Sequence, residues 1–149
     1  MEHPKQRNYR KVIIQLPIDT SLIEEAEHRG YLELNEERSR ITYLCGRKYS
    51  DDFTDPEEVI RAFIYSWLII EKGYPASRIE IEYIVPRREP GDRADIVVFS
   101  DDSRTDPYLV VETKREVCSP TDWHQAIEQG FGNANSLRNT RYLLVDMVR

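Results

Sequence analysis

The chain of 149 residues has only two cysteines and three histidines, and it contains no long hydrophobic run. Its apolar stretches are shorter than the roughly 20 residues of a membrane-spanning helix, and no signal-peptide pattern is present, so we expect a cytoplasmic protein without a membrane segment. Cys45 and Cys118 lack the spacing of a metal or redox motif, which predicts free thiols. His3 and His28 have no nearby partner residue, so we do not expect them to be ligands.

Positive charge is also scarce, since 21 Lys and Arg stand against 27 Asp and Glu and give a net charge of −6. This balance argues against a stand-alone nucleic-acid binder, because DNA affinity usually requires a basic surface. A metal-dependent nuclease can nevertheless be acidic, because its metal site requires several acidic residues in one place. A neighbouring subunit can also present DNA to such an acidic domain. The chain lacks a GxxxxGK[ST] phosphate loop, so any ATP-driven translocation lies outside it. Its final run, LLVDMVR, predicts a fragment of a larger protein or a small stand-alone relative.

The most informative segment is DIVVFSDDSRTDPYLVVETK, at 95–114. Two apolar runs, at 94–99 and 108–111, are joined by a polar connector rich in turn residues, which is typical of an antiparallel hairpin. Pairing Val98 with Leu109 closes the shortest reasonable loop. This register predicts which polar residues face each other at the open end of the hairpin.

At that end, Asp95 is placed opposite Glu112, so we expect both carboxylates on one face of the sheet. Side chains alternate along a strand, so Lys114 shares this face and Thr113 lies on the other. Two carboxylates suit a hard cation such as Mg²⁺, with waters and a substrate phosphate completing its shell. A lysine beside such a metal can orient the attacking water or neutralise charge on the phosphate. The group is therefore suited to phosphodiester hydrolysis.

Asp95 followed by Glu112-Thr113-Lys114 resembles the PD-(D/E)xK nuclease signature, with Ala94 where that family usually has proline. The flanking segments RREPGDRADIVVF and VVETKREVCSPTDWHQAIEQ resemble the N-terminal nuclease domain of type I restriction enzyme R subunits. This resemblance runs from about residue 56 to the end of the chain.

The resemblance implies a Mg²⁺-dependent endonuclease that cleaves DNA, with Mn²⁺ as a substitute metal. Asp95 and Glu112 would bind the metal, and the Thr113 carbonyl would be a possible third ligand. Lys114 would position or activate the water. The expected partners are DNA and, outside this chain, methylation and specificity subunits or a motor domain.

Two further site residues come from helices that the resemblance identifies. The segment 56–72 is the clearest predicted helix, and in the family this helix carries an extra active-site glutamate. By face geometry we prefer Glu57 for that role over Glu58, because Glu57 is expected on the inward side. Gln129 matches the glutamine of a family QxxxY motif on a second helix, where it would bind phosphate or orient Lys114. Asn133 stands at the expected tyrosine, which weakens this assignment.

The element order predicts an α/β or α+β mixed fold, with a central mixed sheet flanked by helices. The resemblance implies a restriction-endonuclease-like core. We expect one domain over 1–149, with 1–50 as an N-terminal β extension and 56–149 as the core. The final strand should run parallel to its neighbour, because a helix precedes it. In the strand at 79–85, Glu80 and Glu82 share a face, which either places one of them near the site or, as we prefer, is exposed to solvent.

Two alternatives to a nuclease stay open at this point. One is a module that keeps the nuclease fold and binds nucleic acid or another protein without cutting. The other is a protein-interaction domain in which Asp95, Glu112 and Lys114 form an ordinary surface salt-bridge cluster. Metal binding and metal-dependent cleavage separate these classes.

Overall fold

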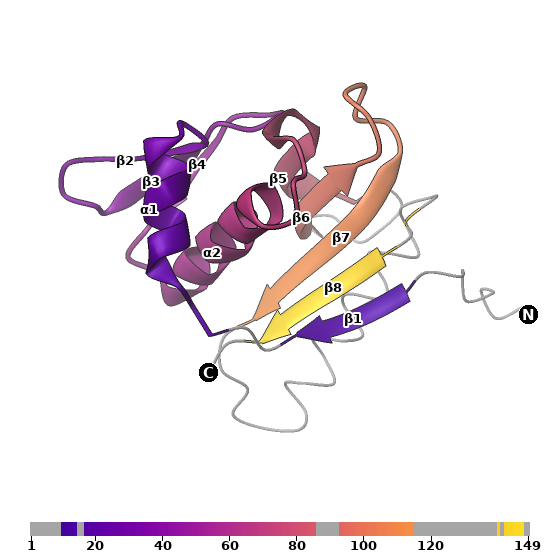
Figure 1. The fold of residues 1–149 in the computed structure, drawn as a ribbon, viewed down its shortest axis with the longest axis horizontal. Helices are drawn as coiled ribbons and strands as arrows, with labels where there is room; N and C mark the ends of the chain where they lie inside the picture. Colours follow the sequence, from indigo (N-terminus) through magenta and orange to yellow (C-terminus); the bar gives the residue numbers. More distant parts are fainter. Residues whose placement is uncertain (1–9, 15–16, 86–92, 115–139, 141, 148–149) are drawn as a thin grey trace, which may run out of the picture.

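The computed structural model describes residues 10–14, 17–85, 93–114, 140 and 142–147. These ranges form an α+β fold with two α-helices, a five-stranded sheet and a separate three-stranded sheet (Figure 1). Among the described residues, no helix is long and apolar enough to cross a membrane. The predicted α+β fold class is therefore confirmed, whereas its assignment to a restriction-endonuclease-like core stays a prediction.

The five-stranded sheet is mixed and has the strand order β1-β8-β7-β6-β5. Strands β5, β6 and β7 pair antiparallel, while β8 runs parallel to both β7 and β1, which confirms the predicted direction of the last strand. Val98 pairs with Leu109, as the hairpin pattern predicted. The strands are β1 (Arg10–Ile14), β5 (Ile79–Ile84), β6 (Arg93–Phe99), β7 (Pro107–Lys114) and β8 (Tyr142–Met147).

Helix α2 (Pro56–Ile70) lies against one face of this sheet (Figure 1). Asp55 caps it by accepting a hydrogen bond from the Glu57 N–H, and proline occupies its first turn. Its apolar side packs on apolar residues of β6 and β7 in one buried cluster. The helix thereby holds its N-terminal turn beside the end of the central hairpin.

The N-terminal part forms two additions to this core. Strand β1 extends the large sheet beside β8, whereas the remaining elements lie on the other side of α2 (Figure 1). Strands β2 and β3 form an antiparallel hairpin, and a third strand pairs with β3, although its sequence YSDD lacks the apolar alternation typical of strands. These elements are α1 (Thr20–His28), β2 (Leu32–Leu34), β3 (Arg40–Tyr43) and β4 (Tyr49–Asp52).

Gly46 fastens the loop after β3 to the start of β5. Its N–H donates to the carbonyl oxygens of Ala76 and Ile79 at 3.1 and 2.9 Å. A Cβ at this position would lie only 2.8 Å from the Ser77 carbonyl oxygen and 2.9 Å from that of Ile79. Backbone atoms cannot move aside easily, so the loop must pass here without a side chain.

We therefore expect Gly46→Ala to lower the free energy of unfolding by about 1–3 kcal/mol, the usual cost of overpacking. Urea denaturation followed by circular dichroism measures this loss. A denaturation midpoint equal to that of the wild type would show that the loop is not clamped against β5.

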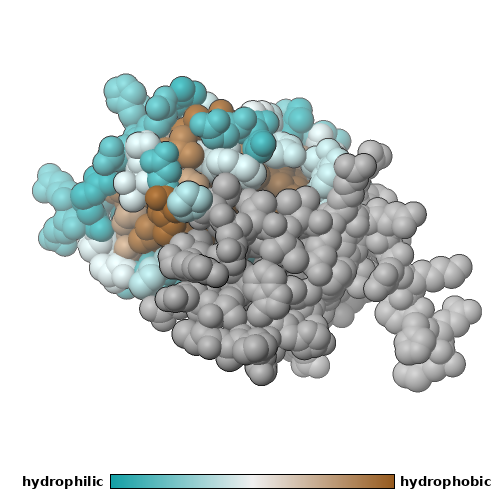
Figure 2. Space-filling model, turned by 60° about the horizontal axis from the view of Figure 1, so that its bottom comes forward, coloured by the Kyte–Doolittle hydropathy of each residue, from teal (hydrophilic) through white to brown (hydrophobic). Residues whose placement is uncertain are grey.

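The described surface is mostly hydrophilic on the face shown in Figure 2, where apolar residues occupy only small spots. The large hydrophobic side chains that are exposed are Ile18, at 36%, and Ile84, at 59%. These two residues are far apart in the sequence and are the exposed large hydrophobic residues of the described part of the chain.

Candidate active site

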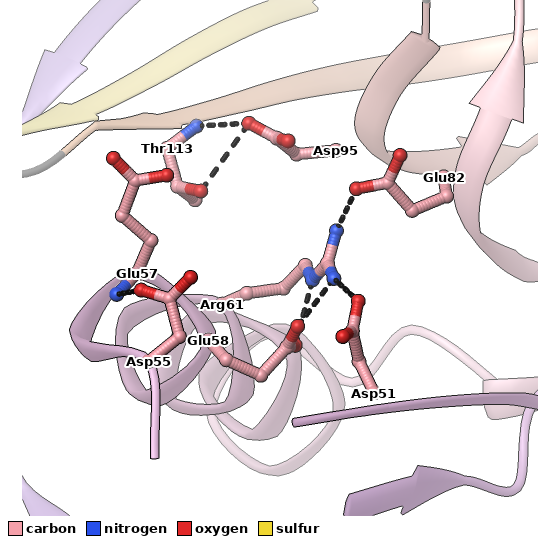
Figure 3. Close-up of a pocket in the computed structure, with 8 residues that line it drawn as sticks. All are labelled: Asp51, Asp55, Glu57, Glu58, Arg61, Glu82, Asp95 and Thr113. Carbon is pink, nitrogen blue, oxygen red and sulfur yellow. Dashed lines mark hydrogen bonds and ion pairs between the residues drawn. The ribbon is translucent and has the colours of Figure 1, made fainter. Parts of the chain in front are cut away.

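An acidic cleft of about 140 Å³ lies between the first turn of α2 and the neighbouring strands (Figure 3). Six carboxylates, one arginine and one threonine line it. Three residues predicted from the sequence, Glu57, Asp95 and Thr113, therefore meet in one place. The full lining is Asp51, Asp55, Glu57, Glu58, Arg61, Glu82, Asp95 and Thr113.

Asp95 in β6 is anchored to Thr113 in β7. Its Oδ2 accepts hydrogen bonds from the Thr113 backbone N–H at 2.7 Å and from the Thr113 hydroxyl at 3.2 Å (Figure 3). A carboxylate that accepts a backbone N–H forms a strong, directional bond. The orientation of Asp95 in the cleft is thus determined by the neighbouring strand.

The expected grouping of side chains at the hairpin end is only partly correct. The β6–β7 pairing continues to Ile96 and Val111, so Asp95 and Glu112 follow as the next pair. Yet Asp95 faces the cleft together with Thr113, whereas Glu112 is fully buried and does not line it. Thr113 therefore lies beside Asp95 and does not face away from it, whereas the metal-binding role of Glu112 stays a prediction.

The adjacent strand β5 has an irregular backbone at Glu82. This residue has φ +53°, in the left-handed region, and the β5–β6 pairing passes from Ile81–Ile96 to Tyr83–Ala94 without it. Strict alternation of side chains requires a regular ladder, which is interrupted beside Asp95. Glu82 itself lines the cleft, although the sequence pattern favoured an exposed strand face for it.

The two glutamates at the start of α2 differ in environment. Face geometry placed Glu57 inward, but the structure buries Glu58, at 5% exposure, and leaves Glu57 exposed. Glu58 is buried because Tyr43 Oη donates to its Oε2 at 2.6 Å and Arg61 binds both of its oxygens. Figure 3 shows Glu57 pointing toward Thr113 and Glu58 turned toward Arg61. The active-site role of Glu57 stays a prediction.

Arg61 is the cation among the residues that line the cleft. Its Nε and Nη2 donate to the two Glu58 oxygens at 2.8 and 2.5 Å, and Nη2 also bonds Asp51 at 3.2 Å. Its Nη1 donates to Glu82. The Arg61 side chain is 6% exposed, and its guanidinium lies 5.2 Å from the centre of the Tyr49 ring. One buried arginine therefore joins three carboxylates from α2, β4 and β5.

These contacts shift the pKa values of the groups involved. Burial raises the pKa of Glu58, although hydrogen bonds and charge from Arg61 oppose the shift. Burial would also raise the pKa of Asp51, but bonds from the Tyr49 hydroxyl and the Asp52 N–H lower it overall. Burial and the bond to Asp51 raise the pKa of Tyr49 to about 12.

Arg61, Asp51 and Glu82 were not among the residues predicted for the site. Arg61 lies three residues after Glu58, a helical spacing that suits an ion pair, so part of the network had a signal in the sequence. Asp51 had none, because its strand was not predicted.

Two predicted residues are not fully tested by this geometry. Lys114 is the last residue of β7 and directly follows Thr113 in the strand. Gln129 lies outside the described residues, as does the second predicted helix.

The cleft offers oxygen donors, which are the ligands that Mg²⁺ prefers. Within the described ranges, no three His, Cys, Asp or Glu side chains are grouped closely enough to hold a metal ion by themselves. Mg²⁺ usually keeps several water ligands and needs only one or two carboxylates, so the donor chemistry fits this ion. Asp95 would hold it directly, with Glu57 across the cleft.

The family model described as type I restriction enzyme R protein N terminus matches residues 56–146. Neither a curated protein nor a solved structure matches the chain. The matched segment includes α2, strands β5 to β8 and every cleft residue except Asp51 and Asp55. Because it covers more than half of the chain and agrees with the pattern around Asp95, the chain belongs to the N-terminal domain family of type I restriction enzyme R proteins.

Proposed function

We propose that this domain is a Mg²⁺-dependent endonuclease that hydrolyses phosphodiester bonds of DNA within a type I restriction system. The observation that carries the proposal is the anchored carboxylate of Asp95, which faces the acidic cleft beside Thr113. The position of Lys114, one residue further along β7, supports it. The family match supplies the restriction context.

The proposal assigns a distinct role to each residue of the signature. Asp95 and Glu112 hold the metal, and the Thr113 carbonyl serves as a third ligand. Lys114 donates a hydrogen bond from Nζ to the attacking water or to the phosphate. Glu57 completes the acidic group through a water molecule, and Gln129 binds phosphate or orients Lys114.

Bound Mg²⁺ would polarise the phosphoryl oxygen and lower the pKa of a bound water. The protein's contribution is orientation, because Thr113 holds Asp95 in one direction and the strand pairing determines the spacing between β6 and β7. Such preorganised groups stabilise charge that develops during the reaction without a cost of reorganisation.

The acidic balance of the chain bears on how DNA reaches this site. A net charge of −6 provides little counterion release on binding DNA. We therefore propose that other parts of the restriction system, namely methylation and specificity subunits or a motor domain, present the DNA. No sequence-reading role is assigned to this domain.

A nicking assay on supercoiled plasmid tests the proposal. The domain is incubated with the plasmid in Mg²⁺ or Mn²⁺, and a parallel reaction contains EDTA. We expect nicked circular DNA only in the reactions with metal. If the domain is inert, calorimetric titration with Mn²⁺ decides whether a metal site exists. Binding that disappears in Asp95→Ala would mean that the domain has its metal site but needs partner subunits to cut.

The second candidate is a module of the same family that docks nucleic acid or protein without cutting. The observation that favours it is the absence, among the described residues, of a compact group of three metal-binding side chains. It predicts neither nicking nor Mn²⁺ binding, and that pair of results would contradict the nuclease proposal.

A further inference from the structure

Tyr43 connects the three-stranded sheet to the first turn of α2. It lies in β3 and is fully buried. Its hydroxyl donates to Glu58 Oε2 at 2.6 Å, and Glu58 is the third residue of α2 and lines the acidic cleft. A buried hydrogen bond therefore joins a strand outside the matched family region, 56–146, to the helix with which this region begins.

We infer that Tyr43 is a positioning residue of the proposed nuclease site. By holding Glu58, its hydroxyl fixes the first turn of α2, from which the Glu57 side chain points toward Thr113 (Figure 3). The inference rests on the proposed function, because it says how that site keeps Glu57 in place. It also makes the three-stranded sheet a part of the site.

The first turn of an α-helix needs such support. Its first N–H groups have no acceptor within the helix, and helix ends fray unless other groups hold them. In α2, the Asp55 carboxylate accepts from the Glu57 N–H at 2.9 Å, and the Asp55 carbonyl oxygen accepts from the N–H groups of Glu58 and Val59 at 3.0 and 3.3 Å. These bonds are local to the turn, whereas the bond from Tyr43 ties the turn to another part of the fold.

Glu58 can transmit this restraint because both of its carboxylate oxygens are bound. Arg61 donates from Nε to Oε2 at 2.8 Å and from Nη2 to Oε1 at 2.5 Å. Glu58 is only 5% exposed, and a buried carboxylate that loses a donor loses part of the compensation for its desolvation. Tyr43 and Arg61 therefore determine the orientation of this side chain, and the backbone of the first turn follows it.

Tyr43 is itself firmly placed. Its backbone pairs with Leu32 on one side and with Tyr49 on the other. Its ring meets the Tyr65 ring edge-on, with the ring centres 4.9 Å apart. Residues that position a functional group must have their own side chains fixed by packing. The hydroxyl of Tyr43 meets this requirement, since it reaches Glu58 from a buried and packed ring.

The residue that gains from this arrangement is Glu57. It is exposed, so its direction depends on the backbone of the first turn. Neighbouring residues of an α-helix are about 100° apart around the axis, and a turn that is anchored through Glu58 thus sets the direction of Glu57 as well. A misplacement of about 1 Å can lower the rate of an enzyme by about 100-fold. Removal of the Tyr43 hydroxyl should therefore slow the reaction, although the hydroxyl itself touches no substrate.

Hydrogen exchange of the first turn tests the inference independently of activity. Tyr43→Phe removes the hydroxyl and keeps the ring, so we expect the variant to fold. The amides of Glu57, Glu58 and Val59 should exchange about tenfold faster than in the wild type, because their local bonds open more often. Nuclear magnetic resonance of the full chain measures each of these rates.

Tyr65→Phe is the matched control. Tyr65 is also a buried tyrosine, and its hydroxyl joins α2 to the N-terminal elements by donating to the Tyr31 carbonyl oxygen at 2.7 Å. It lies two turns after Glu58 along the helix. We expect Tyr65→Phe to lower the melting temperature about as much as Tyr43→Phe, with exchange of the first turn unchanged.

Nicking kinetics in Mg²⁺ provide the second readout. Tyr43→Phe is expected to lower kcat by about 10- to 100-fold with an unchanged KM for plasmid, whereas Tyr65→Phe should keep the wild-type kcat. A merely structural role would lower the melting temperature of both variants and leave both kcat values unchanged. If Tyr43 acts through Glu58, Tyr43→Phe should add little to the loss of kcat in Glu58→Gln, because residues that act through one contact are not additive.

The outcomes separate this inference from the proposed function. Faster exchange of the first turn together with a lower kcat in Tyr43→Phe supports the role of Tyr43. If the wild type nicks, a wild-type kcat or wild-type exchange in Tyr43→Phe overturns this role alone, and the nuclease proposal stands. If the wild type binds Mn²⁺ but needs partner subunits to cut, exchange of the first turn decides. If the wild type neither nicks nor binds Mn²⁺, the proposed function fails and the catalytic role of Tyr43 fails with it.

Discussion

Asp95→Asn is expected to reduce the rate of plasmid nicking by about 10²–10³-fold, the loss typical of removing one preorganised electrostatic group. The replacement keeps the shape of the side chain. In the wild type, the Thr113 N–H donates to Asp95 Oδ2 at 2.7 Å, and the carbonyl oxygen of an asparagine can still accept this hydrogen bond. The fold should therefore survive while the negative charge for the metal is lost. Initial nicking rates in Mg²⁺, together with thermal melting, measure both properties.

Asp102→Asn is the matched control, because it makes the same change at an exposed position in the turn between β6 and β7. It should nick at the wild-type rate. Lys114→Met is expected to be as inactive as Asp95→Asn, since it removes the only ammonium of the signature. Wild-type nicking by Asp95→Asn in a correctly folded sample would exclude the assigned site.

Tyr65→Ala is expected to lower the free energy of unfolding by about 3–5 kcal/mol, the range measured for removal of large aromatic side chains from protein cores. Tyr65 lies in α2, is fully buried and meets Tyr43 edge-on, with ring centres 4.9 Å apart. It therefore joins the N-terminal elements to the helix that forms the cleft. Equilibrium unfolding in guanidinium chloride measures the loss.

Tyr65→Phe separates the hydroxyl from the ring. The Tyr65 hydroxyl donates to the Tyr31 carbonyl oxygen at 2.7 Å, and the loss of one such hydrogen bond costs about 1 kcal/mol. If Tyr65→Ala were no more destabilising than Tyr65→Phe, the packing of α2 against the N-terminal elements would contribute little to stability.

Local patterns in the sequence predicted most of the secondary structure around the site. The predicted helix at 56–72 agrees closely with α2, which spans Pro56–Ile70, because capping and helix termination depend on adjacent residues. The register of Val98 with Leu109 was also correct, since apolar alternation and the connector length constrain a hairpin strongly. The family assignment followed from the spacing of Asp95 and the Glu112-Thr113-Lys114 triplet.

The arrangement of the cleft could not be predicted in the same way. The exposure of Glu57 and the burial of Glu58 depend on Tyr43, which approaches α2 from a different sheet. The turn of Asp95 toward Thr113 accompanies a distortion at Glu82, in the neighbouring strand. Periodicity describes an isolated element and assumes that it is regular, so it contains no information about such contacts.

The sequence by itself determined the helix α2, the register of the central hairpin and the family to which the chain belongs. Only the tertiary structure decided which acids share the cleft and which of them Arg61 neutralises. The physical reason is that helices and hairpins are stabilised largely by neighbours along the chain. The ion-paired group instead joins Asp51, Arg61 and Glu82, and these residues meet only when α2 packs between the two sheets.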